Sequence, residues 1–278
     1  MDKLIAELQR LYFLDDQRCV RETGGEGVLS ADVVARSLTG GPGLELDLVG
    51  ADGRVRTLIV EFNDAADWPH AADLYQAVQD ELDLPAPALG VAGRYQLWFS
   101  LARAVPVAQA IAFLAALRAR YLADLPAKRL AFYPGDGTTA RIALLPGRNA
   151  ASGQWSAFID PTLGSMFTDD PWLAMAPNPD KQAELLGALK SIAPAAFEAA
   201  LGALQSAAPS DSAPLDVAPA TDRVAPRRRS ALNVGSGYRD PQSFLLAVMN
   251  DTSASARQRI AAAKALLPCF PDGLASKP

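Results

Sequence analysis

The apolar residues near the N-terminus recur at helical spacing before any extended pattern begins. Within residues 3–13, the positions that share one helical face are Leu4, Ile5, Leu8, Leu11 and Tyr12. Residues 30–38 form a second such pattern, which opens at Ser30, a residue type favoured at the start of a helix, and ends before two glycines. The pattern therefore predicts two helices ahead of the first strand.

Two runs rich in β-forming residues follow, at residues 44–49 and 55–62. An Asp-Gly pair at Asp52 and Gly53 lies between them, and such a pair between two strands is a strong signal for a tight turn. The pattern predicts a β-hairpin over residues 44–62.

Helical and extended patterns then alternate up to about residue 204. The expected helices are residues 68–82, 107–122, 180–192 and 195–204, and the expected strands are residues 94–101, 129–132, 141–145 and 155–160, with an extended segment after Pro85 and a turn at residues 133–137. Strands and helices mixed in this way predict an α+β fold.

The composition changes after residue 205. Residues 206–229 are rich in Ala, Pro, Ser and Asp without periodicity, which is typical of a flexible linker. Beyond them, residues 240–250 and 252–267 show helical patterns that predict a C-terminal helical hairpin. We expect three parts: an α+β domain over 1–205, a linker over 206–229 and a basic helical tail over 230–278.

The composition argues against a membrane protein, a disulfide framework and a zinc site. Half of the 278 residues are hydrophobic, enough for a substantial core, yet no apolar run is long enough to cross a membrane and the N-terminal helix carries acidic residues. We expect a cytoplasmic protein without a membrane partner. Cys19, Cys269 and the single histidine, His70, are too isolated for a disulfide framework or a zinc site, and His70 is expected to be solvated or capping at a helix start.

Charge is distributed unevenly. The chain carries a net charge of −5, but residues 221–278 hold nine Lys and Arg against four Asp, so that this part is +5 and the remainder is −10. Phosphate contacts need Lys and Arg, so the tail is the part that favours nucleic acid, and the acidic body would need a local basic groove.

Two segments carry a resemblance to a known family. An apolar run ends in Glu61-Phe62-Asn63, and Gly93 opens the later segment Gly-Arg-Tyr-Gln-Leu-Trp-Phe. With these segments, the order of elements over residues 40–150 resembles the primase-polymerase domain of the archaeo-eukaryotic type, as found in bacterial mobile-element and conflict-system proteins. The resemblance implies a primase-polymerase-like core of β-hairpins and helices, in which an acidic pair after an apolar run binds a divalent metal.

The sequence departs from that family at positions that its chemistry needs. Gln96 stands where the family has a histidine that contacts the nucleotide phosphates, and Lys128 and Arg129 stand where a third acid is expected. The resemblance therefore implies a catalytically degenerate site. Its candidate residues are Glu61, Asn63, Asp64 and Gln96, with Glu61 and Asp64 as the candidate metal ligands; no cofactor is indicated, and Mg²⁺ or Mn²⁺ would be needed only by an active enzyme.

Each candidate also has a structural interpretation. Glu61 and Asn63 share one face of a strand, and they could be a relic metal site or a polar strand end. Gln96 could bond a nucleotide or its own neighbours. Asp64 would point to the other face if the strand continued through it. The aromatic residues expected to serve core and lid packing rather than base stacking are Trp155, Phe158, Phe167 and Trp172.

The tail offers further candidate contacts. The arginines expected to contact nucleic acid are Arg94 in the domain and Arg227, Arg228, Arg229, Arg239 and Arg257 in the tail. The helical tail is similar to segments of phage terminase small subunits. Its apolar faces need a partner, so we expect it to dock on the body, to bind a protein or to form a homo-oligomer.

Three functions remain open from the sequence. The first is a catalytically eroded primase-polymerase-like protein that binds nucleic acid or nucleotides in a mobile-element, replication or defence context. The second is an active, divergent primase or nucleotidyltransferase in which Glu61, Asp64 and a third carboxylate such as Asp136 gather round a metal. The third is a structural or packaging protein that assembles through its tail.

Overall fold

The computed structural model describes residues 1–22, 24–135, 140–206 and 245–247. The chain divides into two units, Met1–Ser212 and Ala213–Pro278, and the first unit holds nearly all of the described residues. The arginines expected at the tail, the turn residue Asp136 and most of the expected linker and helical hairpin lie outside the described residues, so the boundaries at 205 and 229 stay predictions.

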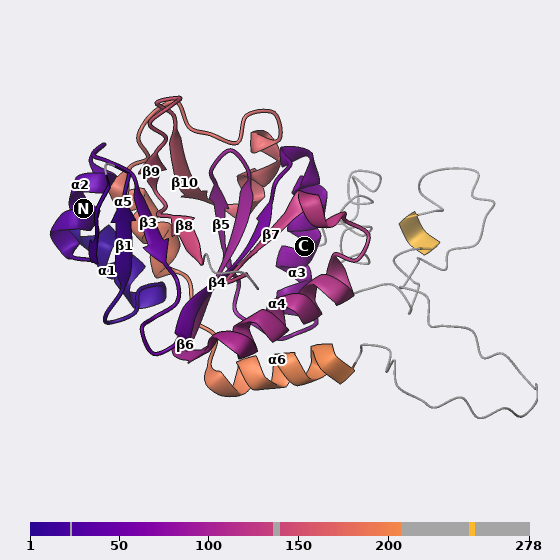
Figure 1. The fold of residues 1–278 in the computed structure, drawn as a ribbon. Coiled ribbons are helices and arrows are strands. Elements are labelled where there is room, and N and C mark those ends of the chain that lie inside the picture. Colours follow the sequence, from indigo (N-terminus) through magenta and orange to yellow (C-terminus); the bar gives the residue numbers. More distant parts are fainter. Residues whose placement is uncertain (23, 136–139, 207–244, 248–278) are drawn as a thin grey trace, which may run out of the picture. The chain divides into compact units, whose positions relative to one another are not determined.

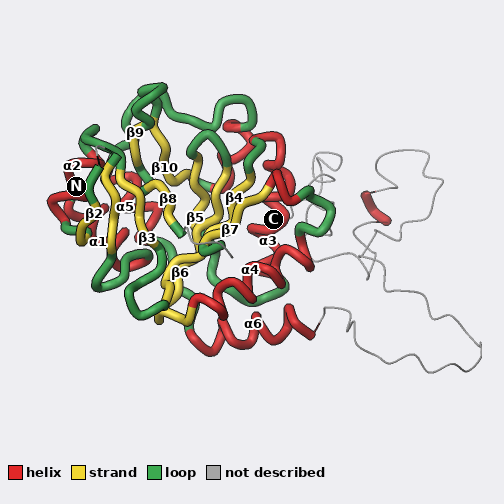
Figure 2. The backbone as a smooth tube through the Cα atoms, in the orientation of Figure 1, coloured by secondary structure: helices red, strands yellow, loops and turns green. Residues whose placement is uncertain are grey.

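A six-stranded antiparallel sheet forms the centre of the first unit (Figures 1 and 2). Its order is β7 (Leu130–Tyr133), β4 (Arg54–Phe62), β6 (Tyr95–Pro106), β5 (Ala88–Val91), β10 (Trp155–Ile159) and β9 (Gly147–Arg148). Most residues of β4 and β6 are buried, and consecutive buried residues point to opposite faces of the sheet. Both strands therefore lie inside the sheet rather than at its edge.

A second, four-stranded antiparallel sheet lies beside the first. Its order is β2 (Glu26–Val28), β1 (Arg18–Arg21), β3 (Leu44–Asp47) and β8 (Arg141–Ala143). Along β3 the side chains alternate between buried and accessible positions, as expected of a strand that covers a core with one face only.

Helices cover both faces of the six-stranded sheet. The helices are α1 (Asp2–Leu11), α2 (Ala31–Leu38), α3 (Trp68–Asp80), α4 (Val107–Tyr121), α5 (Pro179–Gly187) and α6 (Pro194–Ser206), with short 3-10 helices η1 (Ala65–Asp67), η2 (Ala127–Arg129) and η3 (Pro161–Phe167). One core lies between the sheet and α3, α4 and α6. The other core lies between the opposite face, the smaller sheet, α1, α2 and α5 (Figure 1).

These elements confirm the α+β fold class and correct the expected hairpin. A turn does form at Asp52 and Gly53, with a single bridge between Val49 and Val55. However, β3 pairs with β1 and β8, whereas β4 pairs with β6 and β7. The reason is burial: β4 is buried on both faces from Thr57 to Phe62 and fits the larger sheet, which has a core on each side, while β3 is buried on one face only.

The expected strands near residues 129–132 and 141–145 also belong to different sheets, as β7 and β8. The helix expected to run to residue 192 ends at Gly187. It ends early because the following segment returns to β6, where the Ile192 N–H donates to the Ser100 carbonyl oxygen at 2.7 Å. No helix in the described part of the chain is long and apolar enough to cross a membrane.

Candidate functional site

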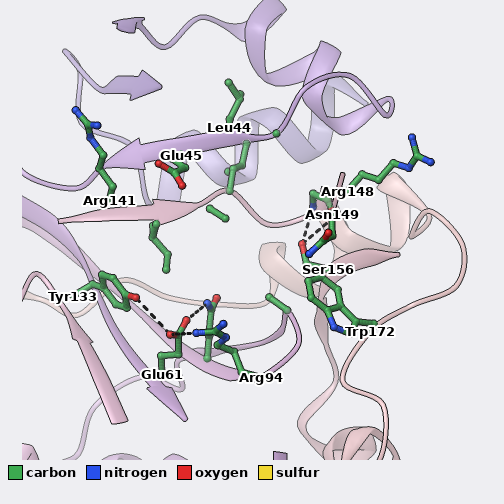
Figure 3. Close-up of a pocket in the computed structure, with 17 residues that line it drawn as sticks. Leu44, Glu45, Glu61, Arg94, Tyr133, Arg141, Arg148, Asn149, Ser156 and Trp172 are labelled. Atoms are coloured by element: carbon green, nitrogen blue, oxygen red, sulfur yellow. Dashed lines mark hydrogen bonds and ion pairs between the residues drawn. The ribbon is translucent and has the colours of Figure 1, made fainter. Parts of the chain in front are cut away.

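A cleft of about 290 Å³ opens between the two sheets (Figure 3). The larger sheet contributes Glu61 from β4, Gln96 from β6 and Tyr133 from β7, while the smaller sheet contributes Glu45 and Arg141. The turn before β6, the β9 strand and the loop after η3 complete the wall with Arg94, Arg148, Asn149 and Trp172. The structure therefore brings three of the predicted site residues, Glu61, Arg94 and Gln96, into one cavity.

Glu61 lies at the floor of the cleft because of the two-residue period of β4. Leu58, Val60 and Phe62 point into the core beneath α3 and α4, whereas Ile59 and Glu61 point to the other face, which carries the cleft. The Glu61 side chain is only 3% exposed. A carboxylate removed from water to this extent needs hydrogen-bond donors around it.

Those donors come from both neighbouring strands. Glu61 faces Gln96 across the β4–β6 pair, and the Gln96 amide nitrogen donates to Glu61 Oε2 at 2.6 Å. The indole nitrogen of Trp98 donates to Gln96 Oε1 at 2.9 Å, which fixes the orientation of the amide. On the other side, the Tyr133 hydroxyl donates to Glu61 Oε1 at 3.4 Å. Burial, and next the nearby Glu61 carboxylate, raise the pKa of Tyr133.

Arg94 supplies the strongest contact. Its Nη1 lies 2.8 Å from Glu61 Oε1 and 3.3 Å from Asn63 Oδ1 (Figure 3). The Asn63 amide nitrogen in turn donates to the Lys128 carbonyl oxygen at 3.1 Å. Asn63 follows the last residue of β4, and one guanidinium contacts both its side chain and that of Glu61, while the 45% exposed Arg94 side chain extends into the cleft.

Asp64 is not part of this cleft. β4 ends at Phe62, and the Asp64 carboxylate accepts from the Ala66 N–H at 2.9 Å to begin the 3-10 helix η1. Its second oxygen lies 3.3 Å from Arg129 Nη2. The sequence placed Asp64 on the opposite face of the strand only if the strand continued through it, and because β4 ends at Phe62, Asp64 has a capping role instead.

The residues present do not fit the divalent metal that the resemblance implies. Such a metal needs carboxylate oxygens that are free to coordinate it, and both Glu61 oxygens already accept hydrogen bonds from Arg94, Gln96 and Tyr133. Among the described residues, no three His, Cys, Asp or Glu side chains gather closely enough to hold a metal. Asp136 lies outside the described part of the chain, so its proposed contribution stays a prediction.

A separate polar cluster surrounds the start of α3. Asp67 is 1% exposed, and its Oδ1 lies 2.6 Å from Arg129 Nη2 and 3.6 Å from His70 Nδ1. The short contact with Arg129 is an ion pair without hydrogen-bond geometry, since neither Asp67 oxygen has a hydrogen-bond partner within the described residues. His70 sits in the first turn of α3 with 41% of its side chain exposed, as expected of a residue at a helix start.

The aromatic residues separate into two groups. Phe158 is buried in the core near α1, and Phe167 packs against the core beneath α3, as the sequence predicts. The Trp155 ring packs against Gly40, 3.8 Å from the position that a Cβ atom of this residue would take. Trp172 instead lines the cleft, where its ring lies so near Gly93 that a Cβ at Gly93 would come within 2.8 Å of it.

Sequence reasoning did not assign several polar and aromatic side chains to the cleft, namely Glu45, Tyr133, Arg141, Arg148, Asn149 and Trp172, the last of which was expected to serve packing. The two-residue period offers a signal for Tyr133, because Ala131 lies opposite Glu61 and Tyr133 follows on the same face. The others come from elements whose position depends on tertiary structure, and no local pattern indicates them.

Comparisons with known proteins give a distant likeness to solved structures. No family model matches the chain, and no curated protein matches it. Among solved structures, the chain is similar to the AEP domain (PP-N190) of the Cyanophage S-2L primase-polymerase (PrimPol), at 15% sequence identity and a TM-score of 0.39. The match covers 66% of this chain and 97% of that chain. At this similarity, no residue role is transferred from that protein.

Proposed function

We propose that this protein binds nucleic acid or nucleotides through the cleft between its two sheets and does not transfer nucleotides by metal-dependent chemistry. The observation that carries the proposal is the engagement of Glu61 by Arg94 on the floor of the cleft. A carboxylate held by a guanidinium is unsuited to hold a catalytic metal, but the half-exposed arginine beside it suits an anionic ligand.

The charge of the cleft supports an anionic ligand. The charged side chains that line it are Arg94, Arg141, Arg148, Glu45 and Glu61. Arginine therefore exceeds glutamate here by one, although the whole chain carries a net charge of −5. Arg141 is also paired with Glu26, so the positive charge that favours the approach of a phosphate group comes mainly from Arg148 and the exposed edge of Arg94.

The shape of the cleft supports an extended ligand. A neighbouring cavity of about 680 Å³ shares Gly43, Glu45, Arg148 and Asn149 with the first and continues along the smaller sheet. Binding sites for small ligands commonly span 300–1,000 Å³, so the two adjoining hollows offer space for more than one nucleotide unit. Trp172 adds an apolar wall at one end, next to Ser156 (Figure 3).

Fluorescence anisotropy tests the proposal. The full-length protein would be titrated into labelled single-stranded and double-stranded DNA and RNA over a series of salt concentrations. We expect salt-sensitive binding that Arg148→Gln weakens several-fold, because a phosphate contact is lost. Arg103→Gln is the matched control, since Arg103 is also exposed but lies on β6 away from the residues that line the cleft.

Three results would contradict the proposal. Equal affinity in the wild type and Arg148→Gln would remove the cleft from nucleic-acid binding. Template-dependent incorporation of nucleotides by the purified protein would favour the alternative of an active, divergent nucleotidyltransferase. Absence of any binding, together with a stable oligomer in solution, would favour the structural or packaging function. None of these measurements tests the mobile-element, replication or defence context, which stays a prediction.

A further inference from the structure

Glu61 and Asn63, which the sequence offers as a relic metal site, already share a cation, whereas the candidate ligand Asp64 lies outside the cleft. Arg94 Nη1 lies 2.8 Å from Glu61 Oε1 and 3.3 Å from Asn63 Oδ1. A guanidinium nitrogen therefore occupies the position between them.

The remaining acceptor capacity of Glu61 is also used. Its second oxygen accepts from the Gln96 amide at 2.6 Å, and the orientation of that amide is fixed by the Trp98 indole. A metal ion would have to displace both Arg94 and Gln96 to reach the carboxylate. Displacing them would leave a buried glutamine and a half-exposed arginine without their partners, which costs free energy.

The outer edge of Arg94 remains available. Both side-chain hydrogen bonds of Arg94 to described residues use Nη1, and neither Nη2 nor Nε donates to a residue in the described part of the chain. A guanidinium is a rigid fork with five N–H donors, so anchoring one nitrogen leaves the opposite donors in a defined direction. Arg94 is 45% exposed and lines the cleft, and so this free edge is accessible from it.

We propose that the guanidinium of Arg94 takes the place of a divalent cation in this cleft and binds a phosphate group of the ligand directly. The inference rests on the proposed function and deepens it, because it names the recognised group and makes its binding independent of Mg²⁺. Glu61 offsets the charge of Arg94, so Arg94 contributes direction, while Arg148 supplies positive charge without an ion-pair partner among the described residues, since Arg141 is paired with Glu26. A lysine could not replace it, since an ammonium is a point charge without a fork.

The first test uses the wild-type protein. Binding of a 5′-phosphorylated, fluorescein-labelled single-stranded oligonucleotide would be measured in EDTA and in Mg²⁺ at equal ionic strength. We expect the same affinity in both. Binding that requires Mg²⁺ would overturn the inference and leave the proposed function standing, whereas no binding in either solution would overturn both.

The second test uses a substitution that keeps the charge. Arg94→Lys should weaken binding of the same oligonucleotide roughly tenfold, because the directed hydrogen bonds to the phosphate are lost, while the dependence of affinity on salt is retained. Arg103→Lys, on β6 and away from the residues that line the cleft, should leave the affinity unchanged. Undiminished affinity of a folded Arg94→Lys protein, with folding checked by circular dichroism, would overturn the inference.

The third test does not depend on a ligand or on the folding of an Arg94 variant. Titration of the wild-type protein with Mn²⁺, followed by electron paramagnetic resonance, should show no tight site that involves Glu61. A tight Mn²⁺ site in the wild type that Glu61→Gln abolishes would show that a metal displaces Arg94, and would overturn the inference.

Discussion

Two buried tyrosines differ in whether the hydroxyl group has a hydrogen-bond partner. Tyr95 donates to the Gly164 carbonyl oxygen at 2.6 Å, whereas the Tyr12 hydroxyl has no partner among the described residues. The Tyr12 ring nevertheless packs well, stacked on Phe158 at 5.9 Å and edge-on to Trp98 at 5.3 Å. The ring of Tyr12 therefore stabilises the fold, while its hydroxyl group carries an uncompensated desolvation cost.

We predict opposite effects of removing the two hydroxyl groups. Tyr12→Phe should leave the free energy of unfolding unchanged or raise it by up to about 1 kcal/mol, because no hydrogen bond is lost. Tyr95→Phe, the matched control, should lower it by about 1–3 kcal/mol, since the Gly164 carbonyl loses its donor. Urea denaturation measures both, and a loss of stability in Tyr12→Phe equal to that in Tyr95→Phe would contradict the prediction.

The period of two along β4 explains which site residues the sequence could predict. Glu61 and Asn63 were expected on one face, and Gln96 was singled out separately; the register of β4 with β6 then places Gln96 opposite Glu61. The position of Asp64 could not be predicted, because where β4 ends depends on the 3-10 helix that follows. The role of Arg94 as partner of Glu61 was also missed, since it depends on which strands pair.

At the scale of elements, local signals located the turns and strands but not their partners. The Asp52-Gly53 turn forms as expected, yet the strands on either side of it enter different sheets. Strand pairing depends on how much apolar surface each strand must bury, and this is settled only when the helices are in place. The short strands β1 and β2 were missed because Arg18–Arg21 and Glu26–Val28 are too short and polar to show a pattern.

The 3-10 helix η3 approaches α3 more closely than a side chain would permit. A Cβ on Gly164 would lie 2.0 Å from the Trp68 ring, which leaves no room for even one methyl group. The same glycine accepts the hydrogen bond from Tyr95 through its carbonyl oxygen. Gly164 therefore holds η3 against both the start of α3 and the start of β6.

We predict that Gly164→Ala lowers the free energy of unfolding by about 1–3 kcal/mol, because the added methyl group forces η3 away from Trp68. Gly202→Ala is the matched control. Gly202 lies in the helix α6 with no atom within 4 Å of its Cβ position, so alanine should stabilise the protein by up to about 1 kcal/mol. Urea denaturation would contradict this account if the two substitutions had the same effect.

Buried and half-buried tyrosines are predicted to make the stability of the domain sensitive to alkaline pH. Burial raises the pKa of Tyr12, Tyr75, Tyr95, Tyr121 and Tyr133 from the ordinary value of 10.0, to about 12 for Tyr95 and Tyr121. Above pH 10 the unfolded chain releases these protons while the folded protein still binds them. Stability contributed by these groups is therefore complete below pH 10 and is lost as pH rises toward their folded pKa values.

Urea midpoints measured from pH 8 to pH 12 test this expectation. We expect a flat region up to about pH 10 and a steady fall above it, with a shallower fall in Tyr121→Phe, which lacks one of the perturbed hydroxyl groups. Tyr121 is only partly buried, so the substitution should leave the midpoint near neutral pH little changed. A constant midpoint up to pH 12, or an equal slope in the variant, would contradict the assignment to tyrosine.

The uneven charge of the chain leads to a prediction about how its two ends share nucleic-acid binding. Arg227, Arg228 and Arg229 lie outside the described residues, in the part of the chain that carries +5 against −10 for residues 1–220. Each phosphate contact made by an arginine releases counterions and adds close to one unit to the slope of log affinity against log salt concentration. Substituting all three by glutamine in the full-length protein should therefore reduce that slope by up to about three for double-stranded DNA.

Replacing Lys3, Arg103 and Lys190, three exposed cations of the acidic domain, by glutamine removes the same charge and should leave the slope unchanged. Equal slopes in all three proteins would place the phosphate contacts in the cleft alone, and a slope reduced equally by both triple substitutions would show that net charge, rather than contact by the tail, governs binding.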